Sequence, residues 1–479
     1  MKQNLIMYWS RRDFRLRDNR ALGNAVNRAK EIDGLLLPVF IIEPYMTSGD
    51  PSFQFGYPSR YFLAQALPLF GQQFPEFAII HDKPVSFFKR LAKKYTIEIY
   101  VNEDIHPDFY VQIRKIREQG ISIKLFRDQM TVSKETVTGS GKRYSVFTPF
   151  KNSVWKSFVN EHEDKTPSFS HVNFADSKHL EIKTIAHDAE KILGLFSKKE
   201  VCLVDDYSID IKDMKLPSRN LEDWYYSEEQ ALLHFKTFLK KINVYKDARD
   251  ILADDGTSKM SLALTWGLVS ARTLVALIKK HSGHTFENPL SSQSSLQGSI
   301  HFISELIWRE FYKYLYFHNP KLFSQPFQEK FNHIKWVPKK LAQQRFSAWI
   351  QGKTGYPIVD AAMMQLAQTG WMHNRARMVA ASVLTKNLGV DWRWGQEYFR
   401  AMLIDLDEAS NNGGWQWGAS VGADPKPIRI FNPYLQAKNY DSNNTYQNTW
   451  LSNEYRLNPP NPIVPHEEAR ADALNRYGL

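Results

Sequence analysis

Two pairs of side chains at helical spacing are well placed to hold a ligand. Glu305 and Trp308 are three residues apart, so on a helix a carboxyl group and an indole would share one face and could meet one ligand. On spacing alone, an exposed i,i+4 ion pair between Glu305 and Arg309 is the simpler interpretation. Asn374 and Met378 are four residues apart. Here the simpler interpretation is an ordinary amphipathic helix with methionine in the core.

Hydroxyl-bearing residues precede a further candidate helix. The segment 256–261 supplies hydroxyls and backbone N–H groups just before the helical stretch 262–268. A helix N-terminus of this kind can hold a pyrophosphate, although a plain N-cap is the simpler interpretation. Asp405 and Asp407 have two possible interpretations, a solvated acidic turn or a contact to a ligand.

Trp415 and Trp417 are two residues apart, so on a helix their side chains diverge by roughly 200°. We therefore expect the two indoles to have different roles. The chain has 13 tryptophans, and a single tryptophan taken alone is more simply a core residue or a surface anchor.

The N-terminal scaffold for these residues is predicted to be an α/β domain. Residues 1–130 alternate β-rich runs with amphipathic segments, which indicates a parallel, doubly wound sheet. No G-x-G-x-x-G follows the first strand, so a dinucleotide fingerprint is absent there. The predicted strands are 5–9, 35–42, 77–80, 97–101 and 123–126, and the predicted helices are 60–70, 85–94 and 108–119.

The remainder divides into a linker and a helical domain. Residues 131–205 are polar and irregular and are predicted to be a long interdomain linker. Helical periodicity dominates residues 206–479, so the expected fold class is α/β plus all-α. Helices are predicted at 228–242, 270–280, 300–316, 358–369, 373–387 and 396–403.

Composition narrows the class of protein. The chain of 479 residues is too long for one ordinary core, and its longest apolar run, 34–42, is too short to cross a bilayer. Cys202 is the only cysteine, which fits a reducing cytoplasm. The net charge of +11 would attract a polyanion, although many basic enzymes bind none. The histidines show no metal-ligand spacing, and no Walker A or G-x-S-x-G motif is present.

Long ordered motifs in the C-terminal part resemble the photolyase/cryptochrome family. The resemblance extends from 13–19 to 462–470, and it is strongest to bacterial-type (class I) cyclobutane pyrimidine dimer photolyases. It implies a lyase that uses light to split ultraviolet-induced pyrimidine dimers in DNA, with an N-terminal Rossmann-like domain and a C-terminal FAD domain. The motifs are 305–312, 355–363, 370–378, 391–393, 403–407 and 411–417.

The resemblance implies one non-covalent FAD in the helical domain. Asp405 is expected to pair with Arg377, and Asn411 is expected beside the flavin N5, where an acid would mark plant-type photoreceptors. Lys259 and Met260 stand where arginine and leucine are expected, and lysine lacks the fork geometry of arginine. The implied cofactor-binding residues are Tyr245, Thr257, Ser258, Lys259, Met260, Ser261, Arg377, Asp405, Leu406, Asp407 and Asn411.

The resemblance also implies a lesion pocket and a DNA contact surface. Glu305 is expected to hydrogen-bond the dimer and Trp308 to stack on it. The branch that repairs (6-4) photoproducts has histidines in the helix of Asn374 and Met378, so these two residues favour the cyclobutane dimer. The implied catalytic residues are Glu305, Trp308, Asn374, Arg375, Met378 and Trp417. The implied DNA contacts are Arg249, Glu305, Trp308, Asn374, Arg375, Arg429 and Gln436.

Two further features follow from the resemblance. Trp415, Trp392 and Trp336 are implied as an electron relay to the surface, with Trp417 kept for the pocket. Asn102 and Glu103 match a pair that binds an antenna pigment in some relatives. The pigment would be a reduced folate or a deazaflavin. Phe302 stands where tryptophan is expected.

The main alternative is a cryptochrome-type photoreceptor with the same fold and flavin. Asn411, Glu305 and Met378 favour repair over signalling. A non-enzymatic nucleic-acid-binding module is a more remote alternative, and such a protein would be colourless. The expected partner is ultraviolet-damaged DNA. We expect a monomeric protein with no bound metal and no membrane association.

Overall fold

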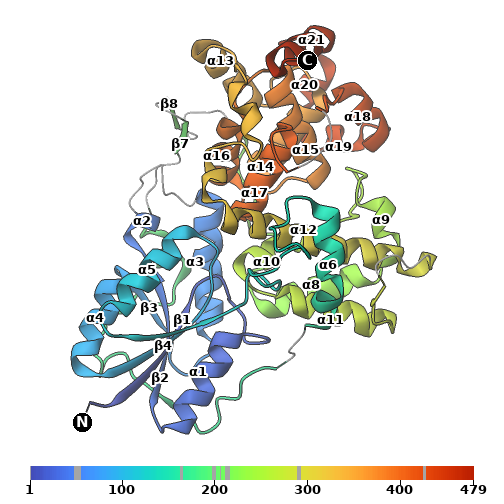
Figure 1. Cartoon of the computed structure of the whole chain (residues 1–479). Coiled ribbons are helices and arrows are strands. Elements are labelled where there is room, and N and C mark those ends of the chain that lie inside the picture. The colour runs from blue at the N-terminus through green and yellow to red at the C-terminus, as the bar shows by residue number, and fades with distance from the viewer. Residues whose placement is uncertain are drawn as a thin grey trace.

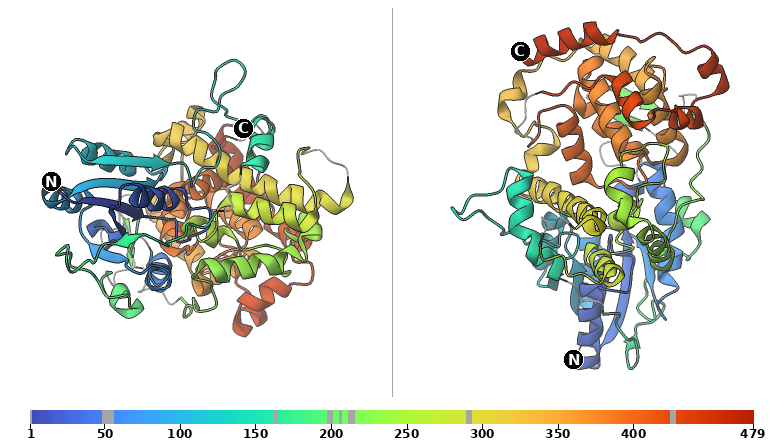
Figure 2. Two further views of the ribbon diagram at one scale, coloured as in Figure 1. Left: turned by 90° about the horizontal axis from the view of Figure 1, so that it is seen from below. Right: turned by 90° about the vertical axis from the view of Figure 1, so that its right-hand side faces the viewer.

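The computed structural model describes residues 2–47, 56–161, 165–196, 201–204, 207–210, 216–288, 293–423 and 428–479. In Figure 1 and in the right view of Figure 2, a sheet flanked by helices lies at one end and a helical body at the other. The expected fold class of α/β followed by all-α is confirmed. Within the described residues, no helix has the length and hydropathy of a membrane span.

The N-terminal sheet is parallel and has the strand order β3-β2-β1-β4-β5. Each predicted strand is present, and its ends lie within one residue of the prediction. These strands are easy to predict because a parallel sheet is covered on both faces and so reads as continuous apolar runs. The strands are β1 (Asn4–Ser10), β2 (Leu35–Ile42), β3 (Ala78–His81), β4 (Thr96–Asn102) and β5 (Ser122–Phe126).

Helices cover both faces of this sheet, so alternate residues of β1 enter different cores. Leu5, Met7 and Trp9 pack in the core formed with α4 and α5. Ile6 and Tyr8 pack in the core formed with α1 and α3. Helices α1 and α2 are the elements of this group that the sequence analysis does not predict. The helices are α1 (Arg20–Glu31), α2 (Pro44–Thr47), α3 (Tyr57–Gly71), α4 (Pro84–Lys94) and α5 (Pro107–Arg117).

Residues 131–196, predicted as part of an irregular linker, also contain regular elements, and these pack on both parts of the molecule. Helix α6 (Phe147–Asn160) packs against α11 and α12. The indole of its Trp155 is buried and donates to the Phe286 carbonyl at 2.6 Å. Strand β6 (Asn173–Phe174) pairs with β2, and α7 (Ala189–Leu193) packs on α3. The predicted boundary between residues 205 and 206 lies outside the described residues.

The predicted helices of the C-terminal part are present, and the structure contains further helices there that were not predicted. A short antiparallel pair, β7 (Val201–Val204) and β8 (Tyr207–Asp210), precedes them. The predicted helix 373–387 is α-helical to Ser382 and continues as a π-helical segment, Val383–Asn387. The α-helices are α8 (Glu228–Leu239), α9 (Tyr245–Ala248), α10 (Ser261–Trp266), α11 (Ala271–Ser282), α12 (Gln297–His318), α13 (Lys339–Ile350), α14 (Pro357–Thr369), α15 (Asn374–Ser382), α16 (Trp392–Met402), α17 (Glu408–Gly418), α18 (Pro433–Tyr440), α19 (Thr445–Trp450), α20 (Asn453–Leu457) and α21 (His466–Tyr477).

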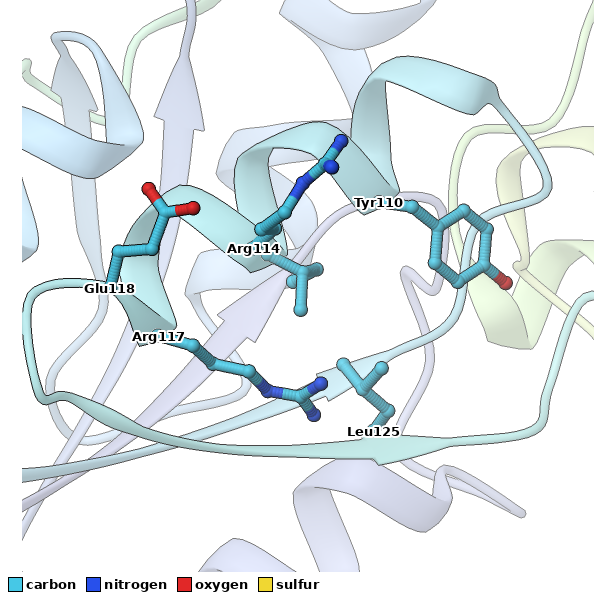
Figure 3. Close-up of a pocket in the computed structure, with 6 residues that line it drawn as sticks. Tyr110, Arg114, Arg117, Glu118 and Leu125 are labelled. Atoms are coloured by element: carbon cyan, nitrogen blue, oxygen red, sulfur yellow. The ribbon is translucent and has the colours of Figure 1, made fainter.

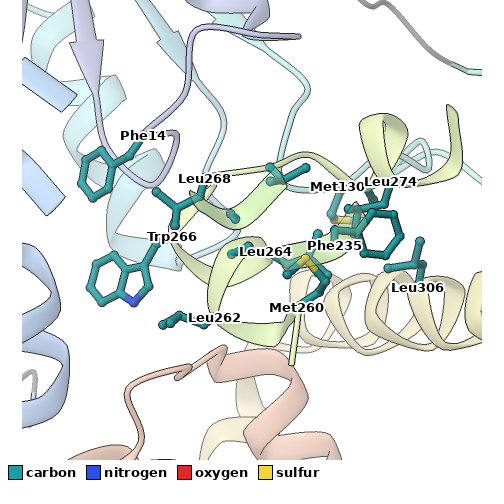
Figure 4. Packing of buried hydrophobic residues seen from close by; sticks show 14 of the residues in the cluster. Phe14, Met130, Phe235, Met260, Leu262, Leu264, Trp266, Leu268, Leu274 and Leu306 are labelled. Atoms are coloured by element: carbon teal, nitrogen blue, oxygen red, sulfur yellow. The ribbon is translucent and has the colours of Figure 1, made fainter. Parts of the chain in front are cut away.

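A buried charge network joins the two parts. Arg272 of α11 bonds Asp18 at 2.8 Å and Asp128 at 2.7 Å, and Arg15 also reaches Asp128 at 2.5 Å. Close by, Trp266 at the end of α10 stacks on Phe14 of the N-terminal part, with ring centroids 6.3 Å apart. Figure 4 shows Trp266 and Phe14 at this junction, beside the apolar side chains of α10. Ionic and apolar contacts therefore fix the sheet against the helical body.

Candidate functional site

One cavity of about 490 Å³ in the helical part collects most of the predicted site residues. Its walls come from α9, α10, α12, α15, α16, α17 and the loops between them. Predicted residues that line it are Tyr245, Arg249, Thr257, Ser258, Lys259, Met260, Ser261, Glu305, Trp308, Asn374, Arg377, Met378, Asp405, Asp407, Asn411, Trp415 and Trp417. Predicted residues outside this lining are Leu406, Arg375, Trp392, Trp336, Arg429, Gln436, Asn102 and Glu103.

The loop before α10 forms a polar wall of the cavity. Lys259 adopts a left-handed conformation with φ of 51°, and its carbonyl accepts the Tyr225 hydroxyl at 2.6 Å. The N-cap of α10 is Met260, which makes no side-chain cap bond. The interpretation of this loop as a side-chain N-cap is therefore wrong. Thr257, Ser258, Lys259 and Ser261 line the cavity instead.

Two carboxylates line the cavity beside three cations. Asp405 forms the expected ion pair with Arg377, and the closest distance between Nη2 and an oxygen is 2.8 Å. Asp407 caps α17 by accepting from the Ser410 amide at 2.9 Å and lies 3.1 Å from the Lys313 ammonium. Burial alone would raise the pKa of Asp407, but Lys313 and Arg309 hold it well below the ordinary value. Asp407 is thus a fixed negative charge in the cavity wall.

Helix α17 carries three predicted residues along the cavity. Asn411 donates its amide to the Gln396 carbonyl at 3.1 Å, which orients its side chain. Trp415 is buried against Phe399, with ring centroids 5.0 Å apart. Trp417 is half-buried, and the Arg429 guanidinium lies 5.4 Å from its ring centroid. The two tryptophans line the same cavity but have different surroundings, as their divergence on a helix predicts.

The predicted relay residues lie in one hydrophobic cluster. Trp415 and Trp392 are buried members of it, and Trp336 is a partly buried residue packed against it. The Trp415 ring lies on Gly395, one turn after Trp392, because a Cβ at Gly395 would lie 2.0 Å from the indole. The chain at Trp336 reaches the start of α16 through the bond from the Val337 amide to the Gly389 carbonyl. Trp415 and Trp392 are thus both almost fully buried, and of the three only Trp336 is partly exposed.

Glu305 forms an ion pair with Arg249, not with Arg309. The alternative i,i+4 pair is therefore wrong, since Arg309 donates to the carbonyls of Gln129 and Leu264 at 3.0 and 3.1 Å. His301, one turn before Glu305, lies 3.7 Å from its carboxylate. The pair of Glu305 and Arg249 lines the cavity, so the carboxyl group is held in place by a cation from α9.

Helix α15 presents Asn374 and Met378 to the cavity. The helix begins where the His373 ring accepts the Arg375 amide at 3.1 Å, and burial lowers the pKa of that histidine to about 4. Asn374 is exposed, and its amide lies 3.7 Å from the Met378 sulfur. Arg375 points away from the cavity lining to an ion pair with Asp250 at 2.8 Å. The helix thus presents the neutral Asn374 and Met378 and the cation Arg377 to the cavity, and it places Arg375 outside the lining.

An aromatic stack supports Trp308. Phe147, the first residue of α6, lies parallel to the Trp308 ring at 9°, with centroids 3.5 Å apart. Tyr312 follows one turn later on α12 at 5.5 Å and also lines the cavity. The segment predicted as a linker therefore supplies a ring that fixes the orientation of a predicted substrate contact.

Some cavity residues are missing from the sequence prediction. Phe302, Leu306, Arg309 and Tyr312 recur at three- and four-residue spacing around Glu305, so helical periodicity on α12 could have found them. Trp371 and Met372 come from the loop before α15 and have no such signal. The lining residues outside the prediction are Leu264, Thr265, Phe302, Leu306, Arg309, Tyr312, Trp371, Met372, Ala381, Phe399, Leu403, Ser410 and Gly414.

The cavity fits a flavin dinucleotide by the chemistry of its donors. The Nε atom of Arg309 is buried and has no hydrogen-bond partner among the described residues, so the wall has a donor to offer an acceptor group. The polar loop at Lys259 suits a pyrophosphate, and the cluster of Asp405, Asp407 and Asn411 suits a heterocycle with both donors and acceptors. No group of three or more described His, Cys, Asp or Glu side chains could hold a metal ion.

A second cavity, of about 570 Å³, lies at the carboxyl ends of β1 and β2. Ligands bind at this position in doubly wound sheets, where the strand order reverses beside β1. Arg11 lines it between Glu43 and Asp104, and Arg400 and Glu408 of the helical part close it.

Two predictions change at this second cavity. Leu406 lines the second cavity and not the first, whereas Asp405 and Arg377 line the first. Asn102 and Glu103 line neither cavity. The Asn102 amide is occupied by Asp13 at 2.7 Å, and the Glu103 carboxylate pairs with Lys134.

A third, shallower hollow lies on the outer side of α5 and the edge strand β5. Figure 3 shows Tyr110, Arg114, Arg117, Glu118 and Leu125 around it. No predicted site residue lines this hollow.

Comparison with known proteins gives one family for the whole chain. Residues 6–168 match the family model of DNA photolyase, and residues 302–478 match the FAD binding domain of DNA photolyase. The deoxyribodipyrimidine photo-lyase of Synechococcus sp. is 33% identical over 471 residues, covering 96% of this chain and 90% of that protein.

Solved structures show the same fold. A bacterial class III photolyase from Agrobacterium tumefaciens is 28% identical, with a TM-score of 0.79, and covers 100% of this chain and 98% of that one. An archaeal photolyase from Sulfolobus tokodaii, described with two FAD molecules, is 25% identical, with a TM-score of 0.77 and 99% of both chains covered. Since the similarity spans the cavity, its walls and the sheet alike, this chain belongs to the DNA photolyase family.

Proposed function

We propose that this chain is a light-driven deoxyribodipyrimidine photo-lyase that repairs cyclobutane pyrimidine dimers in DNA. One observation carries the proposal. The Glu305 carboxyl, the Trp308 and Trp417 rings and the Asn374–Met378 pair line the same cavity as the polar loop at Lys259. The cavity thus joins a flat, aromatic, hydrogen-bonding surface for two stacked bases to a site for a flavin nucleotide.

The residues divide by chemistry. When bound and reduced, FAD supplies the excitable electron donor for ring opening. The loop of Ser258 and Lys259 would hold its phosphates, and Asp405, Asp407 and Asn411 would orient its ring system. The protein binds, orients and excludes water, since the cofactor carries the redox chemistry.

The lesion would be held from three sides. Glu305 accepts a hydrogen bond from the dimer, and Arg249 fixes the carboxylate in place. Trp308 and Trp417 offer broad faces for stacking. Arg375, Arg429 and Gln436 lie outside the cavity lining, where they could meet phosphates as the damaged bases leave the duplex. A damaged base costs less to extrude than an intact one, and photolyases are a named example of this behaviour.

The test of the proposed function is a repair assay with the purified, reduced protein. Illumination should remove cyclobutane dimers from an irradiated oligonucleotide, with no loss in the dark. (6-4) photoproducts in a parallel sample should remain, because Asn374 and Met378 replace ionisable side chains. A yellow, flavin-loaded protein that leaves both lesions intact would favour the cryptochrome-type alternative.

Replacing Glu305 by alanine is expected to lower the repair yield several-fold while FAD stays bound. The variant removes a charge-assisted hydrogen bond to the dimer and leaves Arg249, which is largely buried, without its partner. The measurement is repair per absorbed photon beside the visible spectrum. Glu305→Gln is the matched control, because it keeps the shape and one hydrogen-bonding oxygen, and it should retain more activity. Equal repair by wild type and Glu305→Ala would remove Glu305 from the substrate site.

The second cavity, at the carboxyl ends of β1 and β2, is a candidate site for a second pigment. The Sulfolobus relative is described with a second FAD as a light-harvesting cofactor. Here Asp407 lines both cavities, so a pigment in the second cavity would lie beside the flavin. We propose an antenna chromophore at this site and not at Asn102 and Glu103. Pigments released by denaturing the protein and separated by chromatography should include one besides FAD.

We also propose a cytoplasmic monomer with a catalytic unit that begins near residue 206. The single cysteine fits a reducing compartment. Sedimentation of the purified protein and expression of residues 206–479 alone would test these two points separately.

A further inference from the structure

Lys386 is a buried lysine that the proposed function does not use. It lies in the π-helical segment Val383–Asn387 that continues α15, and only 1% of its surface is exposed. Its Nζ donates to the Gly418 carbonyl and to the Ser420 hydroxyl, the latter at 2.9 Å. Among the described residues, no carboxylate pairs with it. A buried ammonium group without an anion is costly and so calls for an explanation.

The two acceptors of Lys386 lie in the turn that ends α17. Gly418 is the last residue of that helix and packs closely on α15, since a Cβ there would lie 2.8 Å from the Ala381 methyl group. Ser420 has φ of 58°, in the left-handed region that non-glycine residues seldom adopt. A π-helical turn and a left-handed serine are both unusual, and both kinds of feature concentrate at functional sites. The Lys386 amine joins them.

The same turn anchors the segment that carries Arg429. The Arg429 amide donates to the Ser420 hydroxyl at 3.5 Å, and the Phe431 amide donates to the Ser382 hydroxyl at 3.4 Å. Trp417 precedes the turn and packs against Phe431, with ring centroids 6.0 Å apart. Lys386 thus lies beneath the two residues proposed to stack on the lesion and to meet a phosphate.

Among the described residues, the charged group that most affects the Lys386 amine is a cation. Arg429 faces it from the following segment, and Arg476 of α21 donates to its backbone carbonyl. His466 bonds the neighbouring Asn387, and burial lowers the pKa of that histidine, which keeps it neutral.

Two further neighbours are bonded to backbone carbonyls. The Tyr477 hydroxyl donates to the Ala419 carbonyl, and burial raises its pKa. Arg345 of α13 donates to the Leu388 carbonyl. Burial, assisted by Arg429, lowers the pKa of Lys386 to about 7. A DNA phosphate near Arg429 would add an anion to these surroundings, and it would favour the protonated amine.

We propose that Lys386 is a positioning residue of the DNA-binding face, holding the turn 418–420 that presents Trp417 and Arg429, and that its protonation makes binding of damaged DNA tighter at lower pH. The inference rests on the proposed function. Because Lys386 is buried, it acts through Gly418 and Ser420 and does not touch DNA itself.

The test is dark binding of the FAD-loaded protein to an oligonucleotide with one cyclobutane thymine dimer, at constant ionic strength from about pH 6 to about pH 8.5. Wild-type affinity should fall several-fold as pH rises, and about tenfold if DNA raises the amine pKa by about one unit. Lys386→Met should bind several-fold more weakly at low pH, with no pH slope. Lys386→Gln keeps an N–H donor without a charge, so its affinity should be intermediate and also independent of pH.

Two controls separate this role from a general loss of structure. Lys340→Met removes an exposed lysine of α13 and should keep the wild-type slope. Flavin absorbance and photoreduction should be unchanged in Lys386→Met, because Trp415 and the flavin-facing residues do not contact the amine. If Lys386→Met does not fold, the comparison of pH slopes between wild type and Lys386→Gln tests the proposal.

The two possible failures are distinct. Equal wild-type affinity for damaged and undamaged DNA would contradict the proposed function itself. A preference for damaged DNA that Lys386→Met and Lys386→Gln keep, with the wild-type pH slope, would overturn only the role of Lys386.

Discussion

Asp128→Asn is expected to lower the free energy of unfolding by about 3–5 kcal/mol, the usual cost of breaking a buried ion pair. Asp128 accepts from Arg15 and Arg272, whose side chains are almost fully buried. With the carboxylate gone, Asp18 is the remaining anion bonded to Arg272 in this network. Because the network joins the sheet to α11, we expect urea unfolding to shift to lower urea and the two parts to separate more readily. The measurement is urea unfolding followed by circular dichroism.

The matched control is Asp82→Asn, which removes a carboxylate from a surface ion pair with Arg90. Surface pairs contribute less than about 1 kcal/mol, so this variant should unfold almost as wild type does. Equal stability of Asp128→Asn and Asp82→Asn would show that the buried network contributes nothing net.

The sign of the pH dependence follows from Asp128. Burial would raise its pKa, but Arg15 and Arg272 outweigh burial and lower the pKa to about 2. A carboxyl group whose folded pKa is depressed stabilises the protein above its unfolded pKa of about 3.9. That stability is lost as pH falls from about 4 towards 2. The difference in free energy of unfolding between wild type and Asp128→Asn should therefore become smaller in acid.

The five long strands of the parallel sheet could be predicted from the sequence because β1, β2 and β3 are mostly apolar runs, while β4 and β5 are rich in apolar and β-branched residues. Helix α6 could not, although Phe150, Val154 and Phe158 are spaced for one helical face. Pro149 near the start of the helix and the polar residues between these positions obscured that period. The helix is stabilised mainly by tertiary contact with α12. The local sequence pattern thus identifies elements that belong to one hydrophobic core. It misses elements that are stabilised by packing between separate parts of the molecule.

The candidate site shows a similar division. Motif resemblance assigned Glu305, Lys259 and Asp405 to one site, and all three line one cavity, while their roles stay predictions. It did not reveal that Arg249 would pair with Glu305 or that Phe147 would stack on Trp308, because those contacts join segments far apart in the chain. Such partners depend on how helices cross, and no spacing along one helix encodes that.

Trp415→Phe is expected nearly to stop light-driven reduction of bound, oxidised FAD by an external donor. Trp415 lines the flavin cavity, lies on Gly395 of α16 and shares a hydrophobic cluster with Trp392. Phenylalanine keeps most of the packing volume but is far harder to oxidise, so stability should change little while electron supply fails. Repair by enzyme that has been reduced chemically beforehand should survive, because its electron already resides on the cofactor.

Trp417→Phe should give the opposite result. Photoreduction should stay near normal, since Trp415 is intact, while affinity for the dimer falls because a broad stacking face is lost. Measuring photoreduction and dark binding in both variants gives a crossed comparison in which each protein is the control for the other. Trp349 is buried and lies 5.9 Å from Trp415, so it is the structural competitor for the first relay position. Normal photoreduction in Trp415→Phe together with its loss in Trp349→Phe would move the relay to that residue. Loss in Trp415→Phe and Trp392→Phe, with normal photoreduction in Trp349→Phe, would establish the first two steps of the predicted route, through α17 and α16.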